Sequence, residues 1–348
     1  MGFGFERTSF LWVAVFVLVL VLCVCSDGCD LYEGSWVYDD LYPLYDPSSC
    51  PFIRKEFDCH KYGRPDTMFL KYKWQPADCD LPRFNSEEFL RRYKGKKIMY
   101  IGDSLSLNNW QSLVCVLHAS ISQPNITVHT IDSITAVTFL DYEVSVMLFH
   151  SLYLVDIEVK EIGRVMKLDS IKNGDIWKTM DVLIFNTWQW WGRRGTGQQW
   201  DYIQEGNMVY KDMDRMVAFQ KGLMTWAKWV DSAVDTAKTT VFFQGISPSH
   251  YNGTDWNDPG VTNCFGQMEP IRGSTYPPGL PRAHIIVNEV LSTISKPVYL
   301  LDVTTLSQLR KDAHPSKYTG LNVMDCTHWC IPGLTDTWNQ LLYAALMT

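Results

Sequence analysis

Hydrophobic positions fall into two patterns along the chain from about residue 96 onward. Short apolar runs that end in glycine or polar residues predict four buried strands, at 96–102, 181–188, 239–247 and 297–306. Elsewhere, apolar residues recur every three or four positions, which predicts helices from about 104 to 118 and over 214–235. Strands that alternate with helices are typical of an α/β fold with a central, mainly parallel sheet.

The pattern also indicates where a site would lie. Residues 144–159 hold two adjacent extended runs, which indicates a mixed or antiparallel part. In parallel sheets, functional groups gather where the strands end. The polar residues that follow the four predicted strands are Ser104, Asn186, Ser247 and Thr304. We therefore expect a functional site at that edge of the sheet.

Residues 27–95 have a different texture. They are rich in cysteine, proline, tyrosine and aspartate, and they contain few long periodic segments. This predicts a small N-terminal subdomain of loops and short strands held by disulfides, ahead of a larger domain at 96–348. The chain has no internal repeat and no low-complexity tract.

The N-terminus is a targeting segment. Residues 10–25 contain no charge and no proline, and a basic residue before them and acidic residues after them orient the segment. We expect a cytosolic tail at 1–9 and an uncleaved signal anchor at 10–26. A cleaved signal peptide is the alternative, because small cysteines near its end could flank a cleavage site. Both interpretations place the folded part in a secretory lumen or outside the cell.

Charge and cysteine content narrow the class of protein. The formal net charge of -7 and the lack of a long basic block argue against nucleic acid as a partner. Two of the ten cysteines lie in the targeting segment, and the others are Cys29, Cys50, Cys59, Cys79, Cys115, Cys264, Cys326 and Cys330. An even number in an oxidising compartment predicts disulfides, but it does not choose among the many pairings. Sequons at Asn125 and Asn252 predict glycosylation and also fit a lumen.

A metal site is the alternative role for two of these cysteines. The stretch CTHWC places Cys326, His328 and Cys330 close together, and such a cluster could hold zinc. The paired Cys-x-x-Cys spacing is missing, and an oxidising compartment disfavours free thiolates. We expect no metal.

The candidate chemistry begins with Gly-Asp-Ser at 102–104, between a predicted strand and a predicted helix. A plain turn explains it, since glycine tolerates unusual backbone angles and Asp and Ser cap helices. A nucleophilic Ser104 also explains it, because the turn exposes the hydroxyl beside N–H groups that hold an oxyanion. Asp325 and His328, three positions apart, could supply the carboxylate and the base. The alternative is that Asp325 caps the next segment and His328 packs beside Trp329.

Several segments together resemble the plant trichome birefringence-like family, whose catalytic part is a PC-esterase domain of the SGNH or GDSL serine-esterase type. GDSLSLNNWQSL resembles its Gly-Asp-Ser block and DCTHWCIPGLTDTWNQLL its Asp-x-x-His block. CDLYEGSWVYD, GRPD, DLPRFN and QGISPSHYNGTDW also resemble family segments. The similarity runs from about Cys29 to the end. It implies an SGNH-hydrolase-like three-layer fold and a single-pass type II protein of the Golgi membrane, with a secreted or cell-wall protein as the alternative.

The resemblance also implies roles for single residues. It makes Ser104, Asp325 and His328 a catalytic triad, and Ser104 with Asn186 an oxyanion site. Asn186 could instead bond its own backbone at a strand end. Relatives often have histidine where this chain has Gln189, which puts a substrate-positioning role there in doubt. The disulfides that it implies are Cys29–Cys79, Cys50–Cys115, Cys59–Cys330 and Cys264–Cys326.

Aromatic and histidine side chains are candidates for binding substrate. Trp188, Trp190 and Trp191 directly follow a strand end, where at least one could stack on a sugar ring, although tryptophan is more often a core residue. His250 could line the groove for the acceptor. We expect His314 to be a structural loop histidine rather than a second base.

Three functions remain open from the sequence. The leading one is O-acetylation of a cell-wall polysaccharide through an acetyl-serine intermediate, with no bound cofactor and an acetyl donor as co-substrate. An acetylesterase would use the same triad with water as acceptor. A non-catalytic protein that binds or bridges polysaccharide is the third. The expected partners are the polysaccharide and, through the N-terminal anchor, the membrane.

Overall fold

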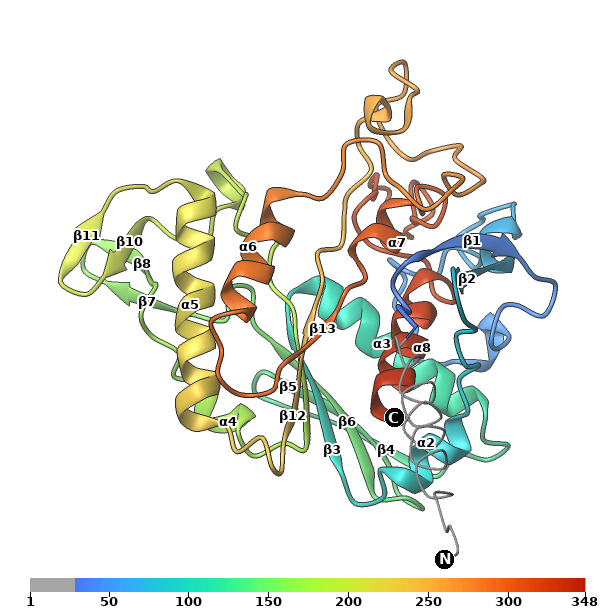
Figure 1. The fold of residues 1–348 in the computed structure, drawn as a ribbon, viewed down its shortest axis with the longest axis horizontal. Helices are drawn as coiled ribbons and strands as arrows, with labels where there is room; N and C mark the ends of the chain where they lie inside the picture. The colour runs from blue at the N-terminus through green and yellow to red at the C-terminus, as the bar shows by residue number, and fades with distance from the viewer. Residues whose placement is uncertain (1–28, 348) are drawn as a thin grey trace, which may run out of the picture.

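A seven-stranded sheet forms the centre of the molecule (Figure 1), in a computed structural model that describes residues 29–347. In spatial order its strands are β13 (Tyr299–Leu301), β12 (Thr240–Gln244), β9 (Val182–Phe185), β3 (Lys97–Gly102), β6 (Val144–His150), β5 (Ile134–Phe139) and β4 (Ile126–Ile131). The first five strands run parallel, and β5 and β4 add an antiparallel hairpin at one edge. The sheet is therefore central and mainly parallel, as predicted.

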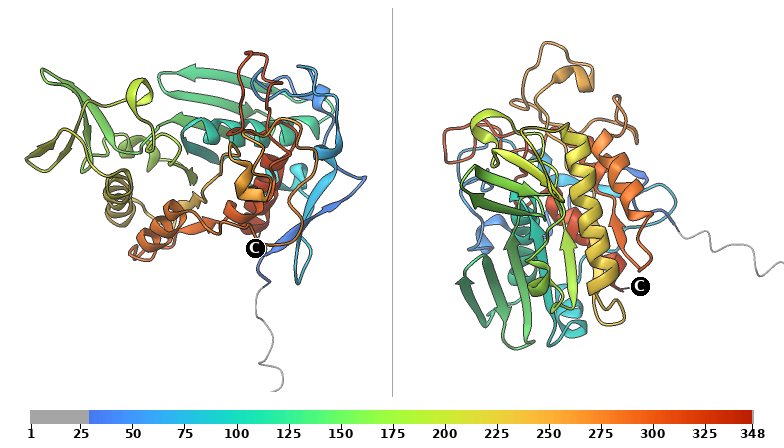
Figure 2. Two further views of the ribbon diagram at one scale, coloured as in Figure 1. Left: turned by 90° about the horizontal axis from the view of Figure 1, so that it is seen from above. Right: turned by 90° about the vertical axis from the view of Figure 1, so that its left-hand side faces the viewer.

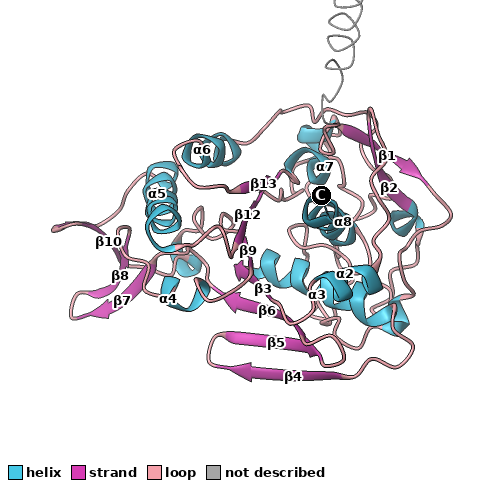
Figure 3. Cartoon of the chain, turned by 60° about the horizontal axis from the view of Figure 1, so that its bottom comes forward, coloured by secondary structure: helices cyan, strands magenta, loops and turns pink. Residues whose placement is uncertain are grey.

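Helices cover both faces of this sheet, so the fold has three layers (Figure 3). One face carries α2 (Ser86–Arg92), α3 (Ser104–Ala119), α7 (Thr304–Gln308) and α8 (Leu334–Met347), and the other carries α4 (Gly174–Trp177), α5 (Arg215–Ala233) and α6 (Arg282–Leu291). Side chains of a strand point alternately to its two faces. In β3, Ile98 and Tyr100 lie in the first core, and Met99 and Ile101 lie in the second. Both cores exclude water, which is why these strands read as continuous apolar runs.

Two smaller sheets flank the centre. A four-stranded sheet lies beside α5 in the order β11 (Met208–Tyr210), β10 (Tyr202–Glu205), β8 (Gly163–Lys167) and β7 (Asp156–Lys160). The two extended runs predicted in 144–159 are β6 and β7, and each has an antiparallel neighbour. They do not pair with each other, because the five residues between them lead the chain from the central sheet to the smaller one.

The N-terminal region is joined covalently to the rest of the molecule. It contains the antiparallel pair of β1 (Gly34–Tyr38) and β2 (Tyr72–Pro76). In the described part of the chain, the 3-10 helices are η1 (Pro47–Ser49), η2 (Met68–Lys71), η3 (Gly195–Gly197) and η4 (Gly253–Trp256). Figure 2 shows this region beside the C-terminal segment, to which Cys59–Cys330 links it. Trp36 of β1 packs in the same core as α8, and its indole N–H donates to the Leu306 carbonyl at 2.8 Å.

Among residues 29–347, the four disulfides have the pairing that the family resemblance implies. They are Cys29–Cys79, Cys50–Cys115, Cys59–Cys330 and Cys264–Cys326. Cys326 and Cys330 are thus both oxidised, which removes the thiolates that a zinc site in CTHWC would need. How far residues 27–95 and 96–348 act as separate domains stays a prediction.

The predicted tail and signal anchor lie outside the described residues. Within residues 29–347, no helix has the length and apolar character needed to cross a membrane. The membrane attachment therefore remains an expectation from the sequence.

Candidate active site

Ser104 stands at the turn between β3 and α3. Asp103 ends the turn as the N-cap of α3, and its Oδ1 accepts a hydrogen bond of 2.9 Å from the Leu105 N–H. At position 102, close packing excludes any residue larger than glycine. A Cβ there would lie 2.3 Å from the carbonyl oxygen of Asn186 and 2.3 Å from Ser106 Oγ. The strand, the tight turn and the cap together bring Ser104 to the carboxyl edge of the parallel strands.

The structure brings Ser104, His328 and Asp325 into one hydrogen-bonded chain. His328 Nε2 lies 2.7 Å from Ser104 Oγ, and His328 Nδ1 lies 2.7 Å from Asp325 Oδ2. These distances are within hydrogen-bond reach, in the order nucleophile, base and orienting carboxylate. Neither a plain turn nor a merely packed histidine would require this contact between residues 224 positions apart.

Asp325 is held in its ionised form. Its Oδ1 accepts from the backbone N–H groups of Thr327 at 2.9 Å and His328 at 3.0 Å. Burial alone would raise the pKa of Asp325, but the hydrogen bond from the His328 ring and the two backbone bonds outweigh burial and lower it to about 2. A carboxylate that stays charged fixes the tautomer of His328 with its proton on Nδ1.

The segment that carries the base is fixed at several points. Ser316 and Asp325 exchange two backbone hydrogen bonds of 2.8 and 2.9 Å. The side-chain amide of Asn108, on α3, accepts from the Trp329 N–H at 2.8 Å and donates to the Trp329 carbonyl at 3.0 Å. Phe57 packs against the His328 ring with its centroid at 5.4 Å. Two disulfides, at positions 326 and 330, complete the frame.

Asn186 lies next to the turn that carries Ser104. It follows β9, is only 2% exposed, and its backbone N–H donates to the Ile101 carbonyl at 2.9 Å. Its side-chain Oδ1 is buried without a hydrogen-bond partner among the described residues. The side chain makes no hydrogen bond to its own backbone. A strand-end asparagine that bonds its own backbone therefore does not explain the position of Asn186.

Asp103 is a second acidic group close to the triad. It is fully buried, and this burial raises the pKa of Asp103 to about 6 although the Leu105 N–H and the charge of His328 act in the opposite direction. Besides capping α3, its carboxyl faces the backbone N–H groups of Trp188 and Gln189, which also lower the pKa of Asp103, and it does not reach Ser104 Oγ or the His328 ring by a hydrogen bond.

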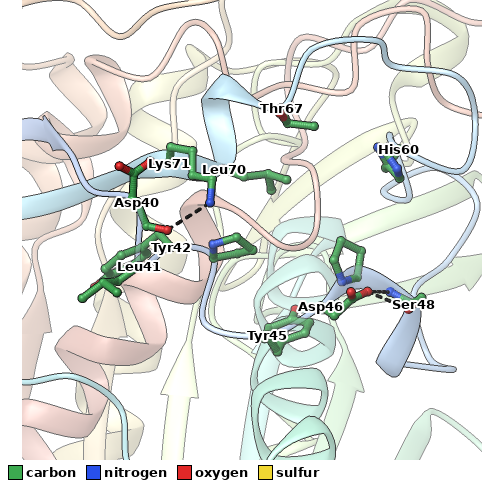
Figure 4. Close-up of a pocket in the computed structure, with 12 residues that line it drawn as sticks. Asp40, Leu41, Tyr42, Tyr45, Asp46, Ser48, His60, Thr67, Leu70 and Lys71 are labelled. Carbon is green, nitrogen blue, oxygen red and sulfur yellow. Dashed lines mark hydrogen bonds between the residues drawn. The ribbon is translucent and has the colours of Figure 1, made fainter.

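The three side chains open on a cavity of about 680 Å³. Its lining also includes Phe52, Leu107, Trp110 and Leu148, which are apolar, and Arg54, Glu56, Gln111, Thr135 and His150, which are polar. Apolar surface with a few polar groups suits a small organic ligand or a sugar. A separate cavity of about 770 Å³ lies in the N-terminal region and is lined by Asp40, Tyr42, His60 and Lys71 among others (Figure 4), but it contains no triad residue.

Two of the expected substrate-binding residues need correction. Trp191 is fully buried, where its indole N–H donates to Thr187 Oγ1 at 2.8 Å. His250 is also fully buried. Neither can contact a sugar in this structure, because each side chain is packed inside the protein and hydrogen-bonded to other protein groups. Trp188 and Trp190 are partly exposed, but they do not line the cavity at Ser104, so their role stays a prediction.

Other expected residues are placed as follows. The Gln189 amide donates to the Ser247 carbonyl at 2.8 Å, which is a structural contact. His314 is buried, in line with a structural role. Asn125 and Asn252, the two sequon asparagines, are exposed.

The sequence did not point to Arg54, Glu56 and Phe57 in the cavity. They lie in the loop between Cys50, which is bonded to α3, and Cys59, which is bonded to Cys330 beside the base. The implied disulfide pairing was the signal that could have placed this loop at the triad.

Comparison with known proteins now identifies the family. A model of the GDSL/SGNH-like acyl-esterase family found in Pmr5 and Cas1p matches residues 81–345, and a model of the PMR5 N-terminal domain matches residues 27–80. Protein trichome birefringence-like 38 of Arabidopsis thaliana is 56% identical over 92% of this chain and 84% of its own length. The chain belongs to the trichome birefringence-like family. Trichome birefringence-like 42 of the same plant is 48% identical over 99% of both chains.

Membership of this family agrees with the geometry at Ser104. The matched family is one of acyl-esterases of the GDSL/SGNH type. The Gly-Asp-Ser turn and the Asp-x-x-His segment, which carried the resemblance in the sequence, are the two segments that the fold joins. This trichome birefringence-like protein is therefore built on an acyl-esterase fold.

Proposed function

We propose that this protein transfers acetyl groups to hydroxyls of a plant cell-wall polysaccharide through an acetyl-Ser104 intermediate. The observation that carries the proposal is the hydrogen-bonded chain from Ser104 through His328 to Asp325, open to a cavity. Membership of an acyl-esterase family supports acyl chemistry at this serine.

The first half-reaction loads the enzyme. Ser104 Oγ attacks the carbonyl carbon of the acetyl donor while His328 Nε2 takes the hydroxyl proton. The tetrahedral intermediate collapses, the bond to the donor breaks, and the leaving group takes the proton from His328. Asp325 stabilises the imidazolium in between, because its carboxylate stays charged beside Nδ1.

The second half-reaction transfers the acetyl group. His328 Nε2 removes the proton from a sugar hydroxyl, whose oxygen attacks the acetyl-serine carbonyl. Ser104 then leaves and recovers its proton from His328. No cofactor takes part in this scheme; the acetyl donor is a co-substrate.

Negative charge develops on the acetyl oxygen in both half-reactions. The Ser104 N–H lies in the first turn of α3, where N–H groups have no partner inside the helix. We assign this N–H and the side-chain amide of Asn186 to the oxyanion site. The buried position of Asn186 beside the turn supports the assignment.

The acceptor separates transferase from esterase. Both reactions use the same triad, and they differ in whether a sugar hydroxyl or water reaches the acetyl-serine. The cavity has apolar side chains such as Phe52 and Leu107, and polar side chains such as Glu56 and His150. This mixture fits the two kinds of surface on a sugar ring, so the cavity can hold the sugar that the transferase needs as acceptor.

The test uses the purified full-length chain, an acetyl donor and a panel of deacetylated xylan, mannan, xyloglucan and pectin oligosaccharides. Mass spectrometry of the products should show acetyl gain on one class of oligosaccharide. Without acceptor, intact-protein mass and peptide mapping should place one acetyl group on Ser104. Donor hydrolysis at the same rate with and without every acceptor would instead establish an esterase, and a label on another residue would exclude double displacement at Ser104.

We place the catalytic part in the Golgi lumen, with the membrane anchor at residues 10–26. Four disulfides and two exposed sequons support a secretory compartment. Glycosidase treatment should remove glycans from Asn125 and Asn252, and N-terminal sequencing of the mature protein should find the anchor intact. A mature N-terminus near residue 27 would favour a secreted protein.

A further inference from the structure

Two buried histidines stand behind the segment that carries the catalytic base. His314 and His250 are 1% and 0% exposed. His314 Nδ1 lies 2.7 Å from the main-chain carbonyl oxygen of His328, and the His314 ring stacks on Trp329 with centroids 3.9 Å apart. His314 therefore contacts the base residue through its backbone, whereas Ser104 contacts it through its ring.

His250 continues this contact into the core. Its Nδ1 lies 2.6 Å from His314 Nε2, and its Nε2 lies 2.9 Å from the carbonyl oxygen of Gln308. The backbone N–H of His250 also donates to the Cys326 carbonyl at 2.9 Å. The two rings thus form a chain of four nitrogens with a carbonyl oxygen at each end.

The number of protons follows from these contacts. A carbonyl oxygen only accepts, so His314 Nδ1 and His250 Nε2 must both carry a proton to form the outer bonds. Each ring is then neutral, and the two inner nitrogens face each other as bare lone pairs at 2.6 Å. Two acceptors repel at this distance. A third proton between the rings removes the repulsion and leaves one positive charge on the pair.

A third buried histidine shows the contrast. His284 Nδ1 lies 3.1 Å from Thr304 Oγ1, and its Nε2 lies 2.8 Å from the side-chain nitrogen of Asn288. The amide N–H donates to Nε2, and Nδ1–H donates to the hydroxyl. One ring proton, on Nδ1, is enough for both of these bonds.

Burial opposes a charge on the pair. It lowers the pKa of His250 to about 4 and lowers that of His314 well below its usual range. A shared proton spreads the charge over two rings whose outer N–H groups both face carbonyl dipoles, and the neutral pair keeps its own repulsion between lone pairs.

The charged neighbours of the pair are few. Asp312 favours the charge on His250 and Lys311 opposes it, while Asp325 favours and His328 opposes a charge on His314. Arg64 donates to the His314 carbonyl at 2.9 Å, and Arg310 is paired with Asp312 at 2.9 Å. Tyr276, which carries an ionisable phenol, has its ring centroid 6.1 Å from that of His250. Charges of both signs lie on these elements, so the neighbouring charges do not determine whether the pair is protonated. The protonation of the pair is set by the hydrogen bonds within the chain of nitrogens.

We infer that His314, backed by His250, is a positioning residue for His328, and that the two rings hold one extra proton between them. The third proton enters from solvent as the chain folds. It keeps His314 Nδ1–H on the His328 carbonyl, and this fixes the backbone from which the imidazole reaches Ser104. The role as a positioning residue rests on the proposed catalytic function of Ser104 and His328, whereas the proton count does not.

The proton count is tested on the full-length wild-type chain with histidine labelled by ¹⁵N. At about pH 6.5, nuclear magnetic resonance should show three ring N–H protons for His250 and His314 together, one of them coupled to nitrogens of both rings. His284 should show one. Two ring protons for the pair, or no nitrogen–nitrogen coupling between the rings, would overturn the shared proton without any variant.

The positioning role is tested with His314→Gln and a matched control, His284→Gln. The readout is the rate at which a serine-reactive phosphonate labels Ser104, together with turnover over a range of pH. A slight misplacement of a catalytic group costs on the order of a hundredfold in rate. We expect His314→Gln to lose about tenfold to a hundredfold in labelling and kcat, with KM little changed and an altered pH profile, and His284→Gln to keep the wild-type labelling rate.

The outcomes separate this inference from the proposed function. Equal labelling in His314→Gln and the wild type would overturn the positioning role. A wild-type Ser104 that does not label at all would overturn the proposed function as well as the role for His314, while leaving the proton count to stand or fall by resonance. If His314→Gln does not fold, His250→Gln gives the same comparison from the second ring.

Discussion

At the scale of single residues, the proposed mechanism gives the members of the triad separable chemical roles. Ser104→Ala and His328→Ala should each lower turnover by on the order of a millionfold, because the nucleophile and its base act as one unit. Asp325→Asn should cost about ten-thousandfold, since the amide leaves the geometry but favours the wrong tautomer of His328. Steady-state rates and melting curves on the same samples test this.

Ser106→Ala is the control for the nucleophile. Ser106 is on the same helix and is buried, but the structure gives it no bond to His328. It should keep most of the activity. A Ser104→Ala protein that retains more than about a tenth of wild-type turnover would remove Ser104 from the triad.

The lowered pKa of Asp325 predicts that the free energy of unfolding changes with pH. Its pKa is about 2 in the folded chain and about 3.9 in an unfolded one. A carboxyl with a depressed pKa stabilises the fold fully above the unfolded value, and this contribution is lost as the pH falls through about 2. The wild type should therefore exceed Asp325→Asn in unfolding free energy by about 1–2 kcal/mol near pH 6, and the difference should shrink from about pH 4 downward. Denaturant titrations at several pH values measure it, and a constant difference would contradict the assignment.

At the scale of elements, β3 and β9 approach closely where both end. Gly102→Ala would place a Cβ 2.3 Å from the Asn186 carbonyl oxygen, and backbone cannot yield as a flexible side chain does. We expect a loss of more than about 2 kcal/mol in unfolding free energy and a large fall in activity, because Ser104 and Asn186 would be pushed apart. Gly192→Ala is the control, since a Cβ there meets nothing within 4 Å. Equal stability of the two variants would contradict the close approach.

The elements differ in how well the sequence predicts them, for a physical reason. β3 and β9 lie between two cores, so nearly every residue is apolar, and both were predicted. β10 has four residues and β11 has three, and both are too short to show a periodic pattern in the sequence. The β4–β5 hairpin was not predicted either, because β4 is an exposed edge strand.

The same reasoning applies to the candidate site. Ser104, Asp325 and His328 could be found because each belongs to a short motif with fixed spacing. Trp191 and His250 could not be assigned correctly, because a motif places a residue along the chain but not the direction of its side chain. That direction is fixed by packing, in these two cases toward Thr187 and His314.

At the scale of the whole molecule, the disulfides differ in how close they lie to the triad residues. Removing Cys264–Cys326 by serine substitutions should cost about 2–5 kcal/mol in stability and, because position 326 adjoins Asp325, about a hundredfold in turnover. Removing Cys29–Cys79, which lies within the N-terminal region, should cost stability but spare turnover.

Turnover and melting temperature, measured for both double variants, test this difference. By the same argument, a mild reductant should abolish turnover before the far-ultraviolet circular dichroism of the sheet is lost. Free thiols at positions 326 and 330 in the native protein, or activity unchanged by reductant, would contradict the proposal that these bridges hold the base.

The Cys59–Cys330 bridge has a consequence for biosynthesis. Its two cysteines are 271 positions apart, and ribosomes add roughly 5–20 residues per second, so Cys59 waits on the order of 15–50 seconds for its partner to be made. During that time, Cys59 is open to wrong partners among the cysteines already made, so we expect efficient maturation to need a thiol oxidoreductase. Ser104 is also synthesised long before His328. The proposed acyl transfer can therefore begin only when nearly the whole polypeptide has been made.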